Sequence, residues 1–437
     1  MASLSSVDIQ ASHLCVVVHG LWGKPIHMAS VAKALRAKFP QDKLHLLVAE
    51  ANAGSFTYDG IDRGGERVCA EIEAEVQRIS DRGGKVRKFS MVGYSMGGLV
   101  VRYTAGLLYA KGFLDSVECM NFTTFATPHL GARAPVKGAF SHVWNAIGSR
   151  TVSMSGRQLF TIDDFRETGK PLLSVLADPG SIFISGLRKF KNRTLYANIT
   201  NDRTAVYYTT SISRTDPYRN LDIIKPNFVP GYGQVVLDAS KPLTPHVPER
   251  VALSARISAF IHSLPFYATI SLLLPIGVVI FLISSIFSTC RSSHRIRLHE
   301  LGQGGVAIEK YRPPLWVQGI RQEVAHAYEA LGSVQGDQFL DTNASGGDGD
   351  EEAMDSDDAR IMTRERRMSI PAQPTLALTP AQFSMIDSLD AVGWRKFPVW
   401  IHNDQHTHAA IIVRFEKETF NEGKLILQHF VQEEFEI

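Results

Sequence analysis

Short apolar runs alternate with amphipathic stretches over the first 200 residues of the chain. We predict strands where four to six apolar residues follow one another, and helices where apolar residues recur every three or four positions. The expected strands are 14–18, 44–49, 89–92, 120–125 and 194–199, and the expected helices between them are 28–38, 66–80 and 97–109. This alternation is typical of an α/β protein with a mostly parallel sheet.

Three intervals of the sequence do not follow this alternation of strands and helices. Residues 129–190 contain glycine-rich and aromatic segments, and we interpret them as a lid inserted above the sheet. Residues 264–289 are almost wholly apolar, and an apolar helix of about 23 residues is long enough to cross a bilayer core. Residues 332–370 are acidic and poor in apolar side chains, so we predict disorder there.

The domain core is expected to be split by these insertions. We predict that it occupies residues 11–255 and is completed by residues 371–437. In the second part, the apolar run Ala410 to Val413 predicts a buried strand, and the stretch after Glu416 is amphipathic.

Composition excludes several classes of protein. The chain has 46 Lys and Arg against 44 Asp and Glu, and no basic stripe interleaved with aromatic residues, so nucleic-acid binding is not expected. Its four cysteines are scattered without C-x-x-C spacing, which gives no support to a metal site or a disulfide framework.

The segment Gly93 to Gly98, GYSMGG, carries the sharpest chemical signal. It matches G-x-S-x-G directly after an expected strand and before an expected helix, which is the context of a nucleophile elbow. Ser95 is then the candidate nucleophile. The helix that begins at Met96 would direct its unpaired N–H groups at negative charge formed there.

The expected strand that ends at Val18 runs into His19-Gly20-Leu21. In a nucleophile-elbow fold, the loop after that strand supplies one N–H of the oxyanion hole, so we predict that Leu21 and Met96 provide the two donors. His19 precedes the serine, whereas the base of such enzymes follows it. We therefore interpret His19 as a structural histidine that supports this loop.

The acid of a triad would follow a further core strand. Asp202 stands at the end of the expected strand 194–199, at the sheet edge where ligands bind. Asp216, Asp222 and Asp238 are competitors.

The base would lie near the C-terminus, where His406 and His408 share one loop. Composition does not choose between them, and His402 is a weaker third candidate.

Five short motifs are highly specific when they occur together in one chain. They are HGLWG at 19–23, YDGI at 58–61 followed by GGER at 64–67, GYSMGGLVVRY at 93–103, TFATPHLG at 124–131 and NDRT at 201–204. With them the chain resembles a serine esterase family of lipase-like α/β-hydrolases, some of whose fungal members are lipid-droplet phospholipases. The similarity covers about 11–215 and resumes at 394–413. The last motif of this family has a histidine three residues before the first isoleucine of an apolar run. His408 stands three residues before Ile411 and matches that position.

This resemblance implies an α/β-hydrolase fold and a carboxylic-ester hydrolase that acts on lipids, most specifically a phospholipase. It implies that Ser95, Asp202 and His408 form the catalytic triad, and that no metal or cofactor is needed. An acyl-protein or acyl-CoA thioesterase with the same triad is one alternative, and a non-catalytic membrane scaffold of hydrolase fold is another.

Topology constrains the apolar interval 264–289. A single crossing would place Ser95 and His408 on opposite sides of a layer about 30 Å thick, while proton transfer needs about 3 Å. We therefore expect a segment that enters and returns on one face, or a helix that lies in the interface. The expected location is a membrane or lipid-droplet surface, with the catalytic part facing the cytosol and with droplet or endoplasmic reticulum as the organelle.

Overall fold

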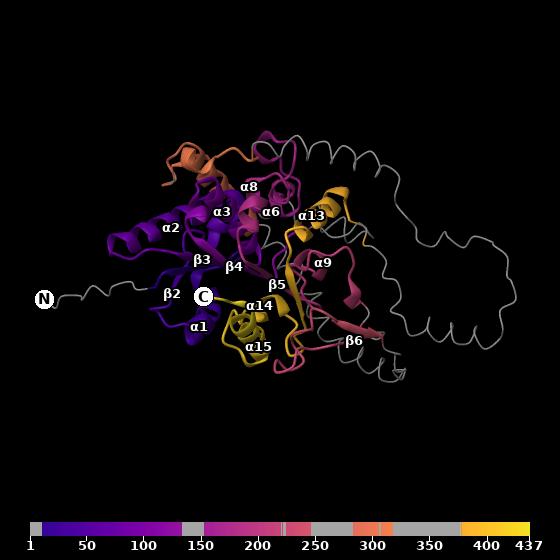
Figure 1. Cartoon of the computed structure of the whole chain (residues 1–437). Helices are drawn as coiled ribbons and strands as arrows, with labels where there is room; N and C mark the ends of the chain where they lie inside the picture. The colour runs from indigo at the N-terminus through magenta and orange to yellow at the C-terminus, as the bar shows by residue number, and fades with distance from the viewer. Residues whose placement is uncertain are drawn as a thin grey trace, which may run out of the picture.

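A six-stranded sheet with helices on both faces forms the centre of the molecule (Figure 1). The structure is a computed structural model that describes residues 11–132, 153–219, 221, 224–245, 283–305, 307–317, 376 and 378–437. All five pairings in the sheet are parallel, and the strand order is β2-β1-β3-β4-β5-β8. The strands are β1 (His13–Val18), β2 (Leu44–Val48), β3 (Lys88–Tyr94), β4 (Glu118–Phe125), β5 (Asn192–Asn198) and β8 (Arg395–Val399). The first five coincide with the strands that the sequence predicts.

Crossover helices connect the parallel strands. The three predicted helices are confirmed as α1 (Ala29–Lys38), α2 (Ile61–Asp81) and α3 (Met96–Ala110). Figure 1 shows α2, α3 and α8 (Ile182–Arg188) on one face of the sheet, and α1 and α15 (Asn421–His429) on the other. Parallel strands joined in this way and covered on both faces give an α/β-hydrolase fold, as the resemblance implies.

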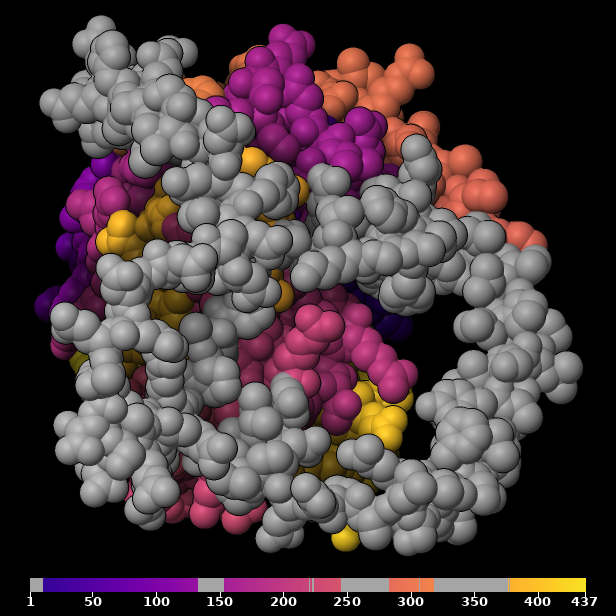
Figure 2. All heavy atoms as spheres, turned by 90° about the vertical axis from the view of Figure 1, so that its right-hand side faces the viewer, coloured from indigo at the N-terminus to yellow at the C-terminus, as the bar shows by residue number. Residues whose placement is uncertain are grey.

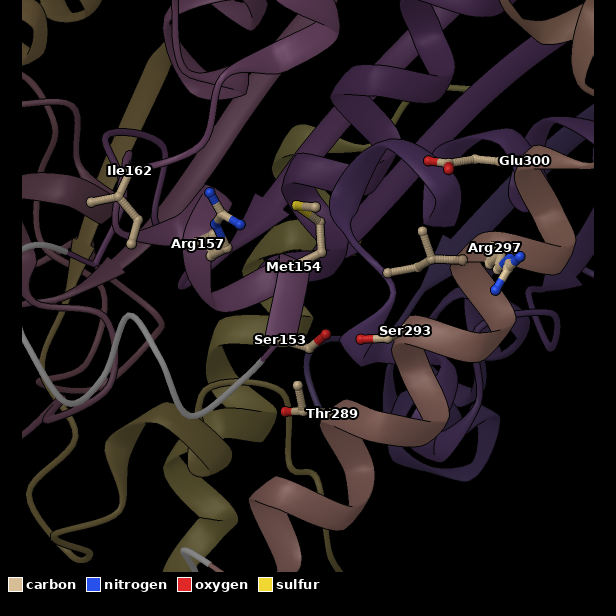
Figure 3. Close-up of a pocket in the computed structure, with 9 residues that line it drawn as sticks. Ser153, Met154, Arg157, Ile162, Thr289, Ser293, Arg297 and Glu300 are labelled. Atoms are coloured by element: carbon tan, nitrogen blue, oxygen red, sulfur yellow. The ribbon is translucent and has the colours of Figure 1, made fainter.

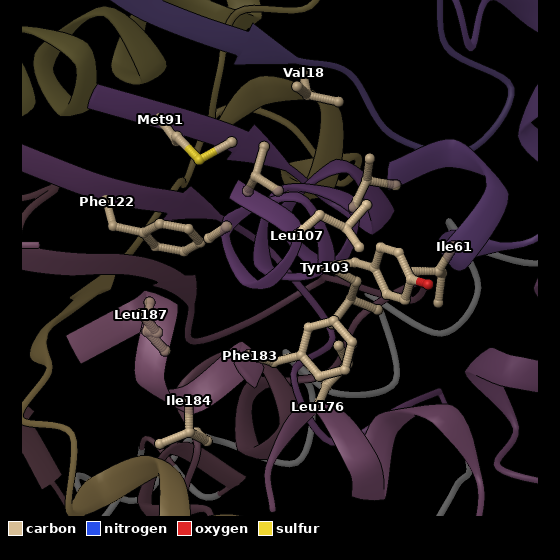
Figure 4. Packing of buried hydrophobic residues seen from close by; sticks show 14 of the residues in the cluster. Val18, Ile61, Met91, Tyr103, Leu107, Phe122, Leu176, Phe183, Ile184 and Leu187 are labelled. Atoms are coloured by element: carbon tan, nitrogen blue, oxygen red, sulfur yellow. The ribbon is translucent and has the colours of Figure 1, made fainter. Parts of the chain in front are cut away.

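Two hydrophobic cores lie on the two faces of the sheet. In β1, Val16 and Val18 belong to the core under α2 and α3, while Cys15 and Val17 belong to the core under α1 and α15. Successive side chains of a strand point to opposite faces, so one wholly apolar strand serves both cores. Figure 4 shows the first core, in which Tyr103 and Phe183 pack with ring centroids 4.9 Å apart.

Apart from the helix at 283–300, the other elements in the described residues have 11 residues or fewer. They are η1 (Pro25–Met28), η2 (Gly54–Tyr58), α4 (Phe113–Ser116), α6 (Ser153–Leu159), η3 (Phe165–Glu167), α7 (Leu172–Leu176), α9 (Tyr207–Thr210), η4 (Pro217–Arg219), β6 (Ile224–Pro226), β7 (Leu243–Pro245), η6 (Ile308–Tyr311), α13 (Pro380–Asp390), α14 (Thr407–Ala410), η8 (Glu418–Phe420) and η9 (Phe430–Glu434).

The interval 129–190 does not behave as one insertion. Residues 133–152 lie outside the described part of the chain. In its second half, α7 and α8 are buried in the core, and α8 packs directly against α3. The described structure thus gives residues 172–188 a place in the core, and the prediction of a lid is not confirmed.

The prediction of a strand at 410–413 is wrong, although the residues are buried as expected. They form the end of α14 and the turn that follows it, and Val413 has a positive φ of 51°. The strand of this region is β8 instead. A short, wholly apolar run is equally compatible with a buried helix turn and a buried strand.

The apolar and acidic intervals are described in part or not at all. Residues 246–282 and 318–375 lie outside the described residues, so most of 264–289 and all of 332–370 do as well. Residues 283–300 form a helix. Within the residues that the structure describes, no helix combines the length and apolarity needed to cross a membrane.

Candidate active site

Ser95 occupies the tight turn between β3 and α3. Its φ of 54° and ψ of −131° lie in a region that side-chain-bearing residues seldom adopt. Such strain persists only where the surroundings impose it, and it is the backbone geometry of a nucleophile elbow. Ser95 is buried, with 7% of the residue exposed, and it follows the carboxyl end of β3.

The glycines around Ser95 are required by close packing. A Cβ on Gly93 would collide with the backbone of Gly98, and a Cβ on Gly98 would collide with the Thr127 side chain. A Cβ on Gly97 would strike the carbonyl oxygens at the end of β1. The first turn of α3 is therefore pressed against β1 and β4, which fixes where Oγ points.

His408 lies beside Ser95, although 313 residues separate them in the sequence. Its Nε2 is 2.9 Å from Ser95 Oγ, and its Nδ1 is 2.9 Å from Asp202 Oδ2. An ionised carboxylate only accepts hydrogen bonds, so Nδ1–H donates to Asp202 and Nε2 is left to accept the Ser95 hydroxyl proton. The three predicted side chains thus form one continuous hydrogen-bonded chain.

Asp202 is buried after the end of β5 and is held by four donors. Oδ1 accepts from the N–H groups of Thr204 and Ala205 at 3.0 and 2.8 Å, and Oδ2 accepts from Asn198 Nδ2 at 3.0 Å and from His408. Burial opposes ionisation of this carboxyl, but the electrostatic attraction and hydrogen bond of His408, together with the other donors, lower the pKa of Asp202 below its usual value. It is therefore ionised at neutral pH.

Two contacts hold the backbone around His408. The Tyr94 hydroxyl donates to the His408 carbonyl at 2.8 Å, and the two rings lie 5.2 Å apart. Thr407 Oγ1 donates to the carbonyl of Thr200 at 3.0 Å, which ties the histidine loop to the end of β5. The imidazole is thus positioned from both β3 and β5.

The loop after β1 lies directly against the nucleophile. A Cβ on Gly20 would collide with Ser95, which brings the Leu21 backbone to the elbow. Met96 is the first residue of α3, where N–H groups have no partner within the helix. Gly20, the residue before Leu21, thus packs against Ser95, and Met96 follows Ser95 directly. The assignment of Leu21 and Met96 as the oxyanion donors stays a prediction.

His19 supports this loop and does not contact Ser95 Oγ through any hydrogen bond found in the described residues. Its Nδ1 donates to the Gly20 carbonyl at 3.0 Å. Burial lowers the pKa of His19, and the nearby charge of Arg414 acts in the same direction. His19 is thus a buried neutral side chain, in agreement with the structural role expected for it.

The competing residues lie in other surroundings. His406 is exposed, and its backbone N–H donates to Asp404 at 2.7 Å. His402 Nδ1 lies 3.0 Å from Glu422. Asp216 accepts the Tyr218 N–H, Asp238 accepts from Ser240, and Asp222 lies outside the described residues.

Sequence reasoning missed Tyr94 and Asn198 as parts of the site. Tyr94 fills the variable position of G-x-S-x-G, and Asn198 is the last residue of β5. Their places beside the elbow and at a carboxyl strand end could have marked them. Only the fold shows what they contact.

Metal ligands do not gather in the described part of the chain. No group of three or more His, Cys, Asp or Glu side chains is arranged there to hold a metal ion. The four cysteines are free thiols, of which Cys290 alone is exposed.

Comparison with known proteins agrees with the geometry. Residues 8–214, just under half of the chain, match the family described as "Putative serine esterase (DUF676)". The putative lipase ROG1 of Saccharomyces cerevisiae is 31% identical over 206 residues, and a putative lipase of Schizosaccharomyces pombe is 26% identical over 204 residues. These alignments cover 46% and 45% of this chain but only 28% and 26% of the two relatives.

Solved structures with distant similarity include phospholipase PlaB from Legionella pneumophila, at 16% identity and a TM-score of 0.28. That match covers 45% of this chain and 40% of that protein. A protein described as a putative cell surface hydrolase from Lactobacillus plantarum gives the same TM-score at 13% identity, over 46% of this chain and 74% of that one.

The family match includes the elbow and the acid, while the residues around His408 lie beyond it. The structure joins the two parts through the hydrogen bonds of that histidine. The chain is thus related to the serine esterase family through residues 8–214, and over that region the resemblance drawn from its motifs is confirmed.

Proposed function

We propose that this chain is a serine hydrolase that cleaves carboxylic esters of lipids. The observation that carries the proposal is the unbroken chain from Ser95 Oγ through His408 to Asp202, with both links at 2.9 Å and with Ser95 on a strained elbow. Serine and histidine within hydrogen-bonding distance, with the base oriented by a third group, are the arrangement of an activated nucleophile.

The chemistry follows from the atoms in place. His408 Nε2 removes the Ser95 hydroxyl proton as Oγ attacks the ester carbonyl, and the N–H groups of Leu21 and Met96 stabilise the oxyanion that forms. The protonated imidazole then gives its proton to the departing alcohol, which leaves an acyl-enzyme on Ser95. Water, activated by the same His408, releases the acid. Asp202 stays ionised and stabilises the imidazolium throughout.

A lipid substrate and a membrane surface belong to the same proposal. The serine esterase match and the relatives named as lipases support a lipid ester. The apolar sequence 264–289 supports attachment to a membrane or lipid-droplet surface, and a phospholipase facing the cytosol is the most specific form of the proposal. Pro245 pairs with Ile224 of β6, and Ser292 donates a hydrogen bond to Asp59. The described residues before and after 246–282 thus both pack with the folded part of the chain, which supports an apolar segment that returns on one face.

The experiment is a hydrolysis assay on purified, detergent-solubilised full chain, with a short-chain p-nitrophenyl ester, its thioester and phospholipid micelles as substrates. We expect hydrolysis of the oxygen ester, and a loss of more than about 10³-fold in kcat for Ser95→Ala and for His408→Ala. His406→Ala is the matched control, because His406 is exposed and the hydrogen bond to Ser95 comes from His408, and it should keep kcat within about threefold.

Other outcomes separate the alternatives. A clear preference for the thioester over the oxygen ester would favour the thioesterase reading. Absence of hydrolysis of every substrate by the folded wild-type chain would favour the non-catalytic scaffold and would overturn the proposal.

A further inference from the structure

The helix formed by residues 283–300 attaches to the rest of the protein through polar side chains. Ser292 Oγ and Arg295 Nη2 each donate to Asp59 Oδ1 at 2.7 Å, and His299 Nε2 lies 2.6 Å from Glu66 Oε2. Ser292 and His299 are almost completely buried in this contact. The side of the helix that faces the protein is therefore hydrophilic.

The opposite side of the same helix is hydrophobic and exposed. Ile283, Ile286 and Phe287 are 64%, 66% and 63% exposed, and Cys290 is exposed as well. Their spacing of three, four and seven residues places them in one stripe, which we call the outer stripe. A helix on the surface of a protein in water normally shows the reverse pattern. The side chains of the outer stripe are consequently more stable in an apolar medium outside the protein than in water.

Basic residues follow the outer stripe along the helix. Arg291 lies with its guanidinium 5.6 Å from the centre of the Phe287 ring, and Arg297 is exposed two turns further on. The sequence immediately before the helix, 264–282, is almost wholly apolar. A change from apolar to basic residues along a helix is typical of a chain that passes from the acyl region of a lipid layer to its headgroups.

A groove runs between this helix and α6. Its volume is about 590 Å³, and Figure 3 shows its walls, which come from α6 and from the helix. The lining residues are Ser153, Met154, Arg157, Ile162, Thr289, Ser293, Ile296, Arg297 and Glu300. Two arginines and three hydroxyl groups next to apolar side chains are suited to an anionic headgroup, and the carboxylate in this lining, Glu300, is already paired with Arg63. Figure 2 shows the region of residues 283–317, in orange, at the surface of the molecule.

The helix lies at the same edge of the sheet as Ser95. Asp59, which holds it, follows η2 in the loop after β2, and the carboxyl ends of all six parallel strands meet at one edge. Arg295 packs over the ring of Phe56 at 4.8 Å, and Trp22 Nε1 donates to the Tyr58 hydroxyl at 2.7 Å. Trp22 and Phe56 are themselves 47% and 41% exposed, so this edge carries further apolar surface close to the oxyanion loop.

We propose that the helix at 283–300 is seated in the surface of an anionic phospholipid layer. Its outer stripe lies among the acyl chains, and Arg291 and Arg297 lie at the level of the headgroups. Because Asp59 clamps the helix to the carboxyl edge of the sheet, this seating turns Ser95 toward the lipid. The benefit for catalysis rests on the proposed function, whereas the seating itself can be measured without hydrolysis.

Cys290 provides a direct probe, since it lies on the outer stripe and the other three cysteines are buried. The full chain carrying Ser95→Ala, with an environment-sensitive NBD fluorophore on Cys290, is mixed with vesicles of phosphatidylcholine and phosphatidylserine. We expect a blue shift of NBD emission and quenching by nitroxide-labelled acyl chains. The control carries Cys290→Ser and Arg82→Cys, which moves the probe to the exposed residue after the last turn of α2, a helix about 30 Å long whose first turns hold the helix at 283–300. Neither change is expected there.

A second pair of variants keeps the test independent of the probe. Phe287→Glu should lower the partition coefficient for the same vesicles by tenfold or more, because a buried aromatic side chain becomes a charge in an apolar phase. Ile437→Glu likewise replaces an exposed apolar side chain by a carboxylate, but outside the outer stripe, and should leave partitioning unchanged. Vesicles of phosphatidylcholine alone should bind more weakly, since the arginines then lack anionic partners.

The outcomes are distinguishable from those of the hydrolysis assay. If the protein floats with vesicles while NBD on Cys290 neither shifts nor is quenched, another segment holds the lipid and this inference is overturned, even if Ser95 hydrolyses soluble esters. A dimer that buries Cys290 in the absence of vesicles, detected by light scattering, would equally overturn it. Lipid insertion at Cys290 without any esterase activity would support the seating and contradict the proposed function.

Discussion

Two buried aspartates, Asp202 and Asp59, hold distant parts of this chain together in different ways. Asp202 receives backbone and amide N–H groups and one histidine. Asp59 is fully buried and receives Arg67 at 2.7 Å, together with Ser292 and Arg295 of the helix at 283–300. Both join residues more than 200 positions apart.

The partners decide what each aspartate can do. A histidine gains and loses a proton near neutral pH, whereas an arginine remains charged under all ordinary conditions. The Asp202 pair can therefore take part in proton transfer, while the Asp59 cluster can only hold structure. Burial of a carboxylate alone does not identify a catalytic group; the protonation chemistry of its partner does.

Asp202→Asn should have the largest effect on activity. The amide would present the wrong hydrogen-bonding pattern to Nδ1 and favour the unproductive tautomer of His408, so kcat should fall by about 10⁴-fold. Circular dichroism should show an unchanged fold. A kcat within tenfold of the wild type would mean that another group orients the histidine.

Asp59→Asn should act on stability instead. It leaves Arg67 and Arg295 without their carboxylate in a buried site, and breaking such a pair costs roughly 3–5 kcal/mol of unfolding free energy. Urea unfolding in detergent measures this loss. Fluorophosphonate labelling counts the active sites in the fraction that remains folded, and kcat per labelled site on a soluble ester should stay unchanged. A 10³-fold loss of kcat per labelled site would contradict a purely structural role for Asp59.

Tyr94→Phe should give an intermediate effect on catalysis. It removes the hydrogen bond from the tyrosine hydroxyl to the His408 carbonyl, which is worth about 0.5–1.5 kcal/mol. We expect kcat to fall by roughly three- to tenfold with KM unchanged. Tyr232→Phe is the matched control, since its hydroxyl donates to Glu433 away from the site, and it should not alter kcat.

The smallest effect that we expect is on the pH dependence of the unfolding free energy, compared between the wild type and Asp202→Asn. The pKa of Asp202 is lowered on folding, so its contribution is present above the ordinary aspartate pKa near 3.8 and is lost as the pH falls through the lower folded value. The gap in unfolding free energy between wild type and Asp202→Asn should therefore shrink below about pH 4. A gap that stays constant from pH 6 to pH 3 would show that the pKa is not lowered.

Local signals made much of the site predictable. The elbow at Ser95 needs a strand, two glycines and a helix in sequence, and all of them stand within the 23 residues from Lys88 to Ala110. Asp202 was marked by its place after a strand. His408 could be separated from His406 only through the family resemblance, because the loop that carries both has no periodicity to read.

Other features depend on contacts that no local pattern encodes. β8 contains Arg395, Lys396 and Pro398 and does not resemble a core strand, yet it lies at the end of the sheet, where a proline without an N–H is tolerated. The polar inner side of the helix at 283–300 is explained by Asp59, which stands 236 residues before Arg295. Charged groups that pair across such distances are visible only in the folded chain.

Whether Ser95 is an activated nucleophile can be measured by labelling the folded chain with a fluorophosphonate and mapping the adduct to a peptide. We expect one adduct, on Ser95, that is lost in His408→Ala and retained in His406→Ala. An adduct on a different serine, or a folded wild-type chain that is not labelled at all, would contradict it.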